Sequence, residues 1–201
     1  MIKYIFSAIG GYLLGSLNPA SLLSKIKKKD LRLVGTKNLG ATNVAFTFGK
    51  GFGALVMLFD LFKAAASYKI FELIFPSVSF IGMTAGVFAV VGHRFPFYLS
   101  FHGGKGLASF GGLVLAYSPS LFFCMLFLAL VLMLAVNYGV AMPLFAAVAF
   151  PASVAVLDKN ILAFLLAFFA SILLVVKFLP NLKRARLGED KKVREYIKKH
   201  M

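Results

Sequence analysis

A lysine surrounded by glycines, between two long apolar runs, is the strongest candidate for chemistry in this chain. Gly103, Gly104 and Gly106 flank Lys105, and glycine lets a backbone approach a ligand with no side chain in the way. The sequence turns apolar after Lys105, so the segment leads into a helix start, where unpaired N–H groups and the helix dipole favour an anion. The pattern predicts a phosphate site built from Lys105 and these amides, and a tight turn between two helices is the alternative.

A histidine precedes this segment. His93 follows Gly92 and stands three residues before the helix-ending Pro96. An imidazole titrates near neutral pH, so His93 is the obvious group to take the proton of an attacking hydroxyl. A helix-capping role fits the same residue, and both roles stay open at this point.

A second polar stretch, residues 35–44, alternates small, amide and hydroxyl residues in a way that few ordinary loops do. Its candidate ligands are Thr36, Lys37, Asn38, Gly40, Thr42 and Asn43. Amide and hydroxyl side chains on a flexible backbone hold a polyhydroxyl or phosphoryl group through several hydrogen bonds, and Lys37 adds charge. We therefore expect the stretch to bind a ligand, although each Asn or Thr singly is also a good helix cap.

Polar residues also lie inside two apolar segments. Asp60 and Lys63 are three residues apart, so they share one helix face and we expect a structural ion pair. Ser16 and Asn18 precede Pro19, and we expect them to satisfy backbone groups that a proline kink leaves open.

The composition is that of an integral membrane protein. Of the 201 residues, 60% are hydrophobic and 14% are charged, whereas soluble domains are about 45–50% apolar. Helices of about 17–25 apolar residues span a bilayer, and we expect an all-α protein with about seven spans. These spans cover residues 2–23, 52–74, 78–92, 106–118, 121–136, 139–157 and 160–179. The third and fourth are too short to cross fully, so we expect residues 93–105 to dip into the membrane.

The positions of Lys and Arg predict the orientation. Residues 25–50, 93–105 and 177–201 carry all but four of the 22 basic residues. By the positive-inside rule these segments face the cytoplasm, which places the N-terminus outside and the C-terminus inside. We expect a single polytopic domain over residues 1–201 with a basic cytoplasmic tail over about 181–201.

Charge and residue spacing also indicate which kinds of ligand and partner to expect. The net charge of +15 is explained by topology and by attraction to anionic lipid head groups, so we expect no nucleic acid. Cys124 is the single cysteine, and His93, His102 and His200 show no metal-ligand spacing, so we expect no metal site.

Several motifs now combine in a characteristic order. They are Asn38-Leu39-Gly40-Ala41-Thr42-Asn43, Asp60-Leu61-Phe62-Lys63, Gly92-His93 with Phe95-Pro96, Phe101 with Gly103-Gly104-Lys105-Gly106, and Asn181-Leu182-Lys183-Arg184. Together they resemble the bacterial acyl-phosphate:glycerol-3-phosphate acyltransferases (PlsY), over nearly the whole chain. The resemblance implies a seven-helix enzyme of the inner cell membrane that moves a fatty acyl group from acyl phosphate to the first hydroxyl of glycerol 3-phosphate, giving lysophosphatidic acid and phosphate.

The resemblance also implies roles for the polar residues. Because an acyl phosphate is already activated, positioning and charge stabilisation suffice, and we expect no cofactor. No obligate protein partner is evident from the sequence. The expected catalytic residues are Lys105, His93, Asn38 and Thr36. The expected substrate-binding residues are Lys37, Gly40, Thr42, Asn43, Gly103, Gly104, Gly106, Asn181 and Arg184.

The chain departs from the family pattern at positions that hold charge. Three residues after Asn43 the family has an arginine, and this chain has Phe46. Three residues before Asn181 the family has a histidine, and this chain has Phe178. Lys37 stands where the family has glycine, and it offers a replacement charge. A paralogue with another acceptor is therefore one alternative function, and a small transporter of an anionic metabolite is another.

Overall fold

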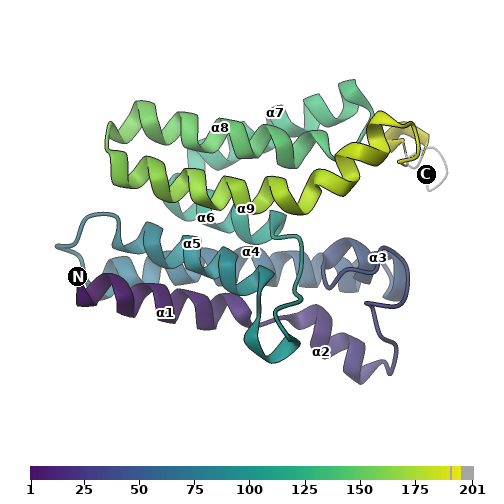
Figure 1. Cartoon of the computed structure of the whole chain (residues 1–201), viewed down its shortest axis with the longest axis horizontal. Coiled ribbons are helices and arrows are strands. Elements are labelled where there is room, and N and C mark those ends of the chain that lie inside the picture. Colours follow the sequence, from purple (N-terminus) through teal and green to yellow (C-terminus); the bar gives the residue numbers. More distant parts are fainter. Residues whose placement is uncertain (191, 196–201) are drawn as a thin grey trace. The chain divides into compact units, whose positions relative to one another are not determined.

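The computed structural model describes residues 1–190 and 192–195, and the chain divides into two compact units, Met1–Tyr117 and Ser118–Met201. Every regular element over the described residues is a helix (Figure 1). The first unit contains α1 (Ile2–Ser16), α2 (Pro19–Ile26), α3 (Ala41–Phe48), α4 (Lys50–Ile74), α5 (Ile81–Arg94), the 3₁₀ turn η1 (Phe97–Leu99) and α6 (Leu107–Tyr117). The second contains α7 (Pro119–Val136), α8 (Ala141–Asp158) and α9 (Ile161–Arg186). His200 and part of the predicted basic tail lie outside the described residues.

Close backbone approach between α1 and α5 holds the first unit together. Gly11 and Gly15 of α1 face Ala85 and Ala89 of α5, and a Cβ on either glycine would collide with the α5 backbone. Small residues at such a crossing let helices gain van der Waals contact where water cannot drive their association. Helix α4 packs against α5, α6 and α3, so both predicted polar loops leave from this bundle.

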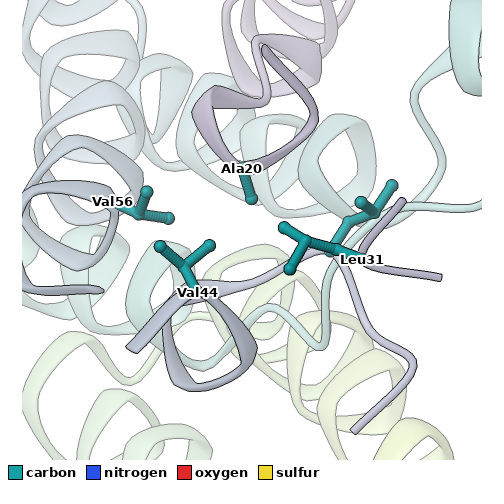
Figure 2. Packing of buried hydrophobic residues seen from close by; sticks show 5 residues of the cluster. Ala20, Leu31, Val44 and Val56 are labelled. Atoms are coloured by element: carbon teal, nitrogen blue, oxygen red, sulfur yellow. The ribbon is translucent and has the colours of Figure 1, made fainter. Parts of the chain in front are cut away.

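A small hydrophobic core fixes the loop between α2 and α3. Ala20 of α2, Leu31 and Leu39 of the loop, Val44 of α3 and Val56 of α4 are each at most 4% exposed (Figure 2). The apolar surface that they bury is the main source of stability for such a segment. The loop is therefore held at its two leucines, and the polar residues between them remain near the surface.

The second unit consists of three apolar helices, with α7 packed on α8 and α8 packed on α9. Its turns carry the capping residues that helix starts require. Ser118 Oγ accepts from the Leu121 N–H at 3.3 Å, and Asn160 Oδ1 accepts from the Leu162 N–H at 2.9 Å. Within the described part of the chain, these three helices are the ones long and apolar enough to cross a membrane.

The first predicted span, residues 2–23, is divided in the structure. Helix α1 ends at Ser16 and α2 begins at Pro19, which lacks an N–H and suits the first position of a helix. Asn18 Oδ1 caps α2 by accepting from the Ser21 N–H at 2.8 Å. The structural role expected for Asn18 is therefore confirmed, as a break between two helices.

The other six predicted spans fall on α4 to α9. Helices α5 and α6 contain 14 and 11 residues, as short as expected. Helix α3 was not predicted, because its residues lie in the stretch whose polar pattern indicates a binding loop. The number of helices that cross the bilayer, their orientation and the single domain over 1–201 stay predictions.

Candidate active site

Three charged or titratable side chains meet inside the first unit, between α4 and α5. Lys63 Nζ lies 2.7 Å from Asp60 Oδ1 and 3.0 Å from His93 Nδ1, and each of the three residues is at most 7% exposed. Lys63 also donates to the Leu17 carbonyl at 2.6 Å, at the break between α1 and α2. The predicted Asp60–Lys63 ion pair is confirmed, and His93 is its third member, which the sequence does not predict.

Lys63 supplies hydrogen-bond donors to this cluster. A lysine ammonium only donates, and its Nζ lies within hydrogen-bond distance of the Leu17 carbonyl, Asp60 Oδ1 and His93 Nδ1. His93 Nδ1 also lies 3.2 Å from Asp60 Oδ1, so this nitrogen accepts from Lys63 in one tautomer and donates to Asp60 in the other. The Nε2 atom of the ring lies against Gly104.

The cluster has the composition of an ion pair rather than of a metal centre. Asp60 and His93 are two groups that commonly bind metals, but they contact each other at 3.2 Å and both contact the positively charged Lys63. Over residues 1–190 and 192–195, no group of three or more His, Cys, Asp or Glu side chains is close enough to hold a metal ion.

The glycine-rich loop folds back onto the end of α5. The Gly103 N–H donates to the Arg94 carbonyl at 3.0 Å, and the Gly104 N–H donates to the His93 carbonyl at 3.2 Å. A Cβ at Gly104 would collide with the His93 ring, so this approach requires glycine. Both amides, which were predicted to bind phosphate, are therefore bonded to α5 in this structure, and their role in binding phosphate stays a prediction.

Lys105 and Gly106 lie where the loop becomes α6. Lys105 is half-buried, and Gly106 has a φ of 92°, in the left-handed region that favours glycine. The Gly106 carbonyl accepts from the Phe110 N–H at 2.8 Å and so begins the hydrogen bonds of α6. The predicted helix start after Lys105 is confirmed, and the positive end of the helix dipole lies beside this lysine.

Asn43 organises the loop between α2 and α3 instead of facing a ligand. Its side chain is fully buried. Its Nδ2 lies 2.8 to 3.1 Å from the carbonyl oxygens of Leu31, Val34 and Asn38, and its Oδ1 accepts from the Thr36 N–H at 2.8 Å. The polar atoms of this side chain are engaged by the loop backbone, and its predicted role in substrate binding stays a prediction.

The other predicted ligands of this loop are more open. Thr36, Lys37 and Thr42 are exposed, and Asn38 is half-buried. Gly40 is buried and precedes α3, where a Cβ would lie 2.9 Å from Asn38 Nδ2. Lys37 has a φ of 53°, a conformation that costs a residue other than glycine about 1–2 kcal/mol. These exposed groups form a polar rim that a ligand can reach.

Two predicted binding residues belong to the second unit. Asn181 is half-buried and Arg184 is exposed, both in the last turns of α9. Their role in binding stays a prediction.

Two tyrosines, which the sequence analysis does not select, tether the loop after α5 to α1. Tyr12 donates from its hydroxyl to the Phe95 carbonyl at 2.8 Å. Tyr98 donates to the Ser16 carbonyl at 2.8 Å and accepts from the Asn18 N–H at 3.0 Å. Burial raises the pKa of the Tyr98 hydroxyl, so this group stays protonated and can donate. The sequence does not single out these two tyrosines, because tyrosine is common at membrane interfaces whether or not it bonds to another segment.

Arg94 carries a buried charge, and it too is missing from the predicted ligands. It is 7% exposed, and its Nε and Nη1 atoms have no hydrogen-bond partner among the residues that the structure describes. Its guanidinium lies 5.0 Å from the centroid of the Phe95 ring, a contact worth about 0.5–2 kcal/mol. The C-terminal end of α5 adds about 0.3–1 kcal/mol. Taking an ion out of water costs several kcal/mol, so these contacts leave the charge largely uncompensated.

Known proteins share the sequence pattern, some of them over their whole length and some over about three fifths of it. The family model described as Glycerol-3-phosphate acyltransferase matches residues 5–188. The glycerol-3-phosphate acyltransferase of Wolbachia sp. subsp. Brugia malayi (strain TRS) is 33% identical over 192 residues, which cover 96% of this chain and 99% of that protein. That of Aquifex aeolicus (strain VF5) is 40% identical over 119 residues, which cover 59% of this chain and 62% of that protein.

Two solved structures have the same fold. Both are crystal structures of PlsY (YgiH), an integral membrane glycerol 3-phosphate acyltransferase. The glycerol 3-phosphate form is 30% identical with a TM-score of 0.86, and the lysophosphatidic acid form is 28% identical with a TM-score of 0.84, each over 94% of both chains. The shared fold and the apolar helices thus define a helical, multi-pass integral membrane protein. The chain belongs to the glycerol-3-phosphate acyltransferase family, as its motifs predict.

Proposed function

We propose that this chain transfers a fatty acyl group from acyl phosphate to the sn-1 hydroxyl of glycerol 3-phosphate, giving lysophosphatidic acid and phosphate. The strongest support is its 30% identity, over 94% of both chains, to a solved glycerol 3-phosphate form. The hydroxyl oxygen bonds to the acyl carbon, the bond from that carbon to the phosphate oxygen breaks, and the hydroxyl proton passes to a phosphate oxygen. Family membership favours this reaction over transport of an anionic metabolite.

Lys105 stabilises the phosphate that leaves. The charge on this phosphate grows as the acyl bond breaks, and a cation beside a helix start is complementary to that growing charge. The Gly106 amide belongs to the same helix start. Gly103 and Gly104 act sterically, because they let the loop lie against His93, and His93 in turn is a positioning residue held by Asp60 and Lys63.

The rim of the loop between α2 and α3 orients the acceptor. Thr36, Asn38 and Thr42 supply hydrogen bonds to hydroxyl and phosphoryl oxygens, with Lys37 as the nearby charge. The left-handed backbone of Lys37 accounts for the glycine that the family has at this position. A strained lysine there fits a functional residue, since such strain persists mainly where it serves a site. For Asn181 and Arg184 of α9, a role in substrate binding rests on the family motif alone.

The departure at Phe46 supports a second candidate, an acceptor other than glycerol 3-phosphate. Phe46 is 45% exposed and offers no charge where the family has an arginine. The same assay with a series of polyol phosphates tests this, and an alternative acceptor that outcompetes glycerol 3-phosphate would establish it.

We further propose seven spans in the inner cell membrane, with the N-terminus outside and the polar loops in the cytoplasm, where a soluble acceptor can enter while the acyl chain reaches the site from the bilayer. Single cysteines at Lys28, His102 and Glu195, in a chain without Cys124, are expected to resist an impermeant thiol reagent added outside. A cysteine at Lys159 is expected to react. Labelling of position 28 from outside would overturn this orientation.

Turnover is expected to depend on Lys105. Lys105→Met keeps the apolar stem and removes the charge, and it should lower the rate of lysophosphatidic acid formation by roughly 10²–10³-fold, as loss of one stabilising donor does. The assay uses purified protein in lipid with acyl phosphate and radiolabelled glycerol 3-phosphate. Lys159→Met, an exposed lysine between α8 and α9, is the control. A folded Lys105→Met protein with normal turnover would place the phosphate site elsewhere.

A further inference from the structure

Arg94 stands apart from the other buried charges of the first unit. Lys63 and Asp60 bond to each other at 2.7 Å, and both contact His93. Arg94 is equally buried, at 7% exposed, yet its Nε and Nη1 atoms have no partner within residues 1–190 and 192–195. Asp60, the acidic group of this region, already has two partners.

Arg94 lies next to the glycine-rich loop, where its positive charge suits binding of an anion. Its carbonyl accepts from the Gly103 N–H at 3.0 Å, so Arg94 and the glycine-rich loop are joined directly. Lys105 follows Gly103 by two residues and precedes α6, which begins at Leu107. A cation at the end of α5 and another in the loop that folds back onto it favour a ligand with more than one negative charge, such as a phosphate group.

The two local contacts of the Arg94 guanidinium, the Phe95 ring and the C-terminal end of α5, do not replace an anionic partner. The Phe95 ring lies over one face of the guanidinium, and an aromatic face provides no hydrogen-bond acceptor of the strength of a carboxylate or phosphate. A guanidinium has five N–H donors, and those on buried atoms keep the full cost of desolvation until an acceptor arrives.

We propose that the Arg94 guanidinium binds a phosphoryl group of a substrate, which makes Arg94 a second phosphate-binding residue beside the Lys105 loop. This inference rests on the proposed function for the source of the phosphate, which is either the acyl phosphate or the phosphorylated acceptor. The shared chemistry is a phosphate dianion that forms charge-assisted hydrogen bonds with Nε and Nη1.

A binding experiment with inorganic phosphate tests this without any turnover. The full chain is purified in a neutral detergent, and because it contains no tryptophan, circular dichroism follows thermal unfolding. Phosphate is expected to raise the Tm of the wild type at constant ionic strength. Arg94→Met should weaken the apparent Kd for phosphate by about 10- to 150-fold, the loss typical of a charged hydrogen bond. Arg94→Lys should recover part of the response.

The stability of Arg94→Met without phosphate separates binding from a structural role. Removing an unpaired buried charge should raise the Tm in phosphate-free buffer, whereas loss of a structural residue should lower it. Arg32→Met is the matched control, because Arg32 is exposed and pairs with Asp30 at 2.8 Å. It should keep the phosphate response of the wild type. A phosphate response of Arg94→Met equal to that of the wild type would overturn the proposal.

Kinetics and lipids identify the source of the phosphate. Arg94→Met should raise the KM for acyl phosphate or for glycerol 3-phosphate by at least about tenfold and leave the other KM near its wild-type value. Unchanged values of both would overturn the proposal. So would a difference between wild type and variant that appears only in vesicles of phosphatidylcholine with phosphatidylglycerol and never with phosphate, since a lipid headgroup would then be the ligand. If the wild type has no acyltransferase activity, the phosphate titration still decides the role of Arg94.

Discussion

The two units of this chain differ in how many polar residues they bury. Over residues 1–190 and 192–195, thirteen of the fourteen buried polar or charged residues belong to the first unit, and the remaining one is Ser171 in α9. Helices α7, α8 and α9 are, by contrast, the described helices that are long and apolar enough to cross a membrane. The buried polar groups of the described residues are thus concentrated in the first unit, whereas the second unit is mainly apolar.

The first unit sustains so many buried polar groups because most of them bond to one another or to the backbone. A polar group taken out of water is costly unless its hydrogen bonds are replaced, and the Asp60–Lys63–His93 cluster and Asn43 replace theirs within the unit. Ser171 Oγ has no such partner among the described residues. Substituting a buried polar group should therefore have opposite effects in the two units.

Breaking the Asp60–Lys63–His93 cluster should have the largest effect on stability. Asp60→Asn leaves the Lys63 ammonium buried without its counter-charge, and removal of one partner of a buried pair typically costs about 3–5 kcal/mol. The measurement is the shift of the thermal unfolding midpoint in detergent, together with unfolding by denaturant.

The matched control lies on the same helix at the same spacing. Lys69 and Glu72 also pair at 2.7 Å, with side chains 54% and 45% exposed, and an exposed pair is worth about 0–1 kcal/mol. Glu72→Gln should therefore change the midpoint little. If Asp60→Asn costs no more than Glu72→Gln, buried pairing does not stabilise the first unit, and the contrast between the units fails.

Removing the Asn43 side chain should have an intermediate effect. Asn43→Ala leaves several buried backbone groups of the loop between α2 and α3 unpaired, at a cost of about 1–3 kcal/mol. The loop should then open locally, so limited trypsin digestion should cut faster after Arg32 and Lys37. Asn160→Ala removes a helix cap in the second unit and should leave cleavage at those two residues unchanged. Equal cleavage in both variants would mean that Asn43 does not hold the loop.

Spacing within one element predicted several of these features. Asp60 and Lys63 are three apart on one helix, so their pairing follows from helix geometry. Asn18 before Pro19 predicted a kink with a polar side chain that satisfies the freed backbone groups, and in the structure Asn18 caps α2 at that point. Both inferences need only neighbouring residues, and both agree with the structure.

Features that depend on distant residues were not predictable. His93 joins Asp60 and Lys63 from 30 or more positions away, and nothing local indicates that meeting. The Gly103 and Gly104 amides looked available because their acceptors lie on α5, which the loop reaches only by folding back. Asn43 looks the same in sequence whether it binds a ligand or its own loop. The isolation of Arg94 is a property of its surroundings, which composition does not encode.

The smallest expected change in stability comes from removing a buried serine hydroxyl, and the sign of this change should differ between the units. Ser171→Ala removes a buried hydroxyl that has no partner among the described residues, so the stability of the protein should stay the same or rise by up to about 1 kcal/mol. Ser109→Ala makes the same change in the first unit, where Ser109 Oγ donates to the Asp60 carbonyl at 3.0 Å and joins α6 to α4. Loss of that bond should lower stability by about 0.5–1.5 kcal/mol.

The effects of both serine substitutions are measured as shifts of the unfolding midpoint. Both substitutions create the same small void, so the cavity contribution largely cancels in the comparison. Two shifts of the same sign and size would mean that packing, rather than hydrogen bonding, governs buried serines in both units.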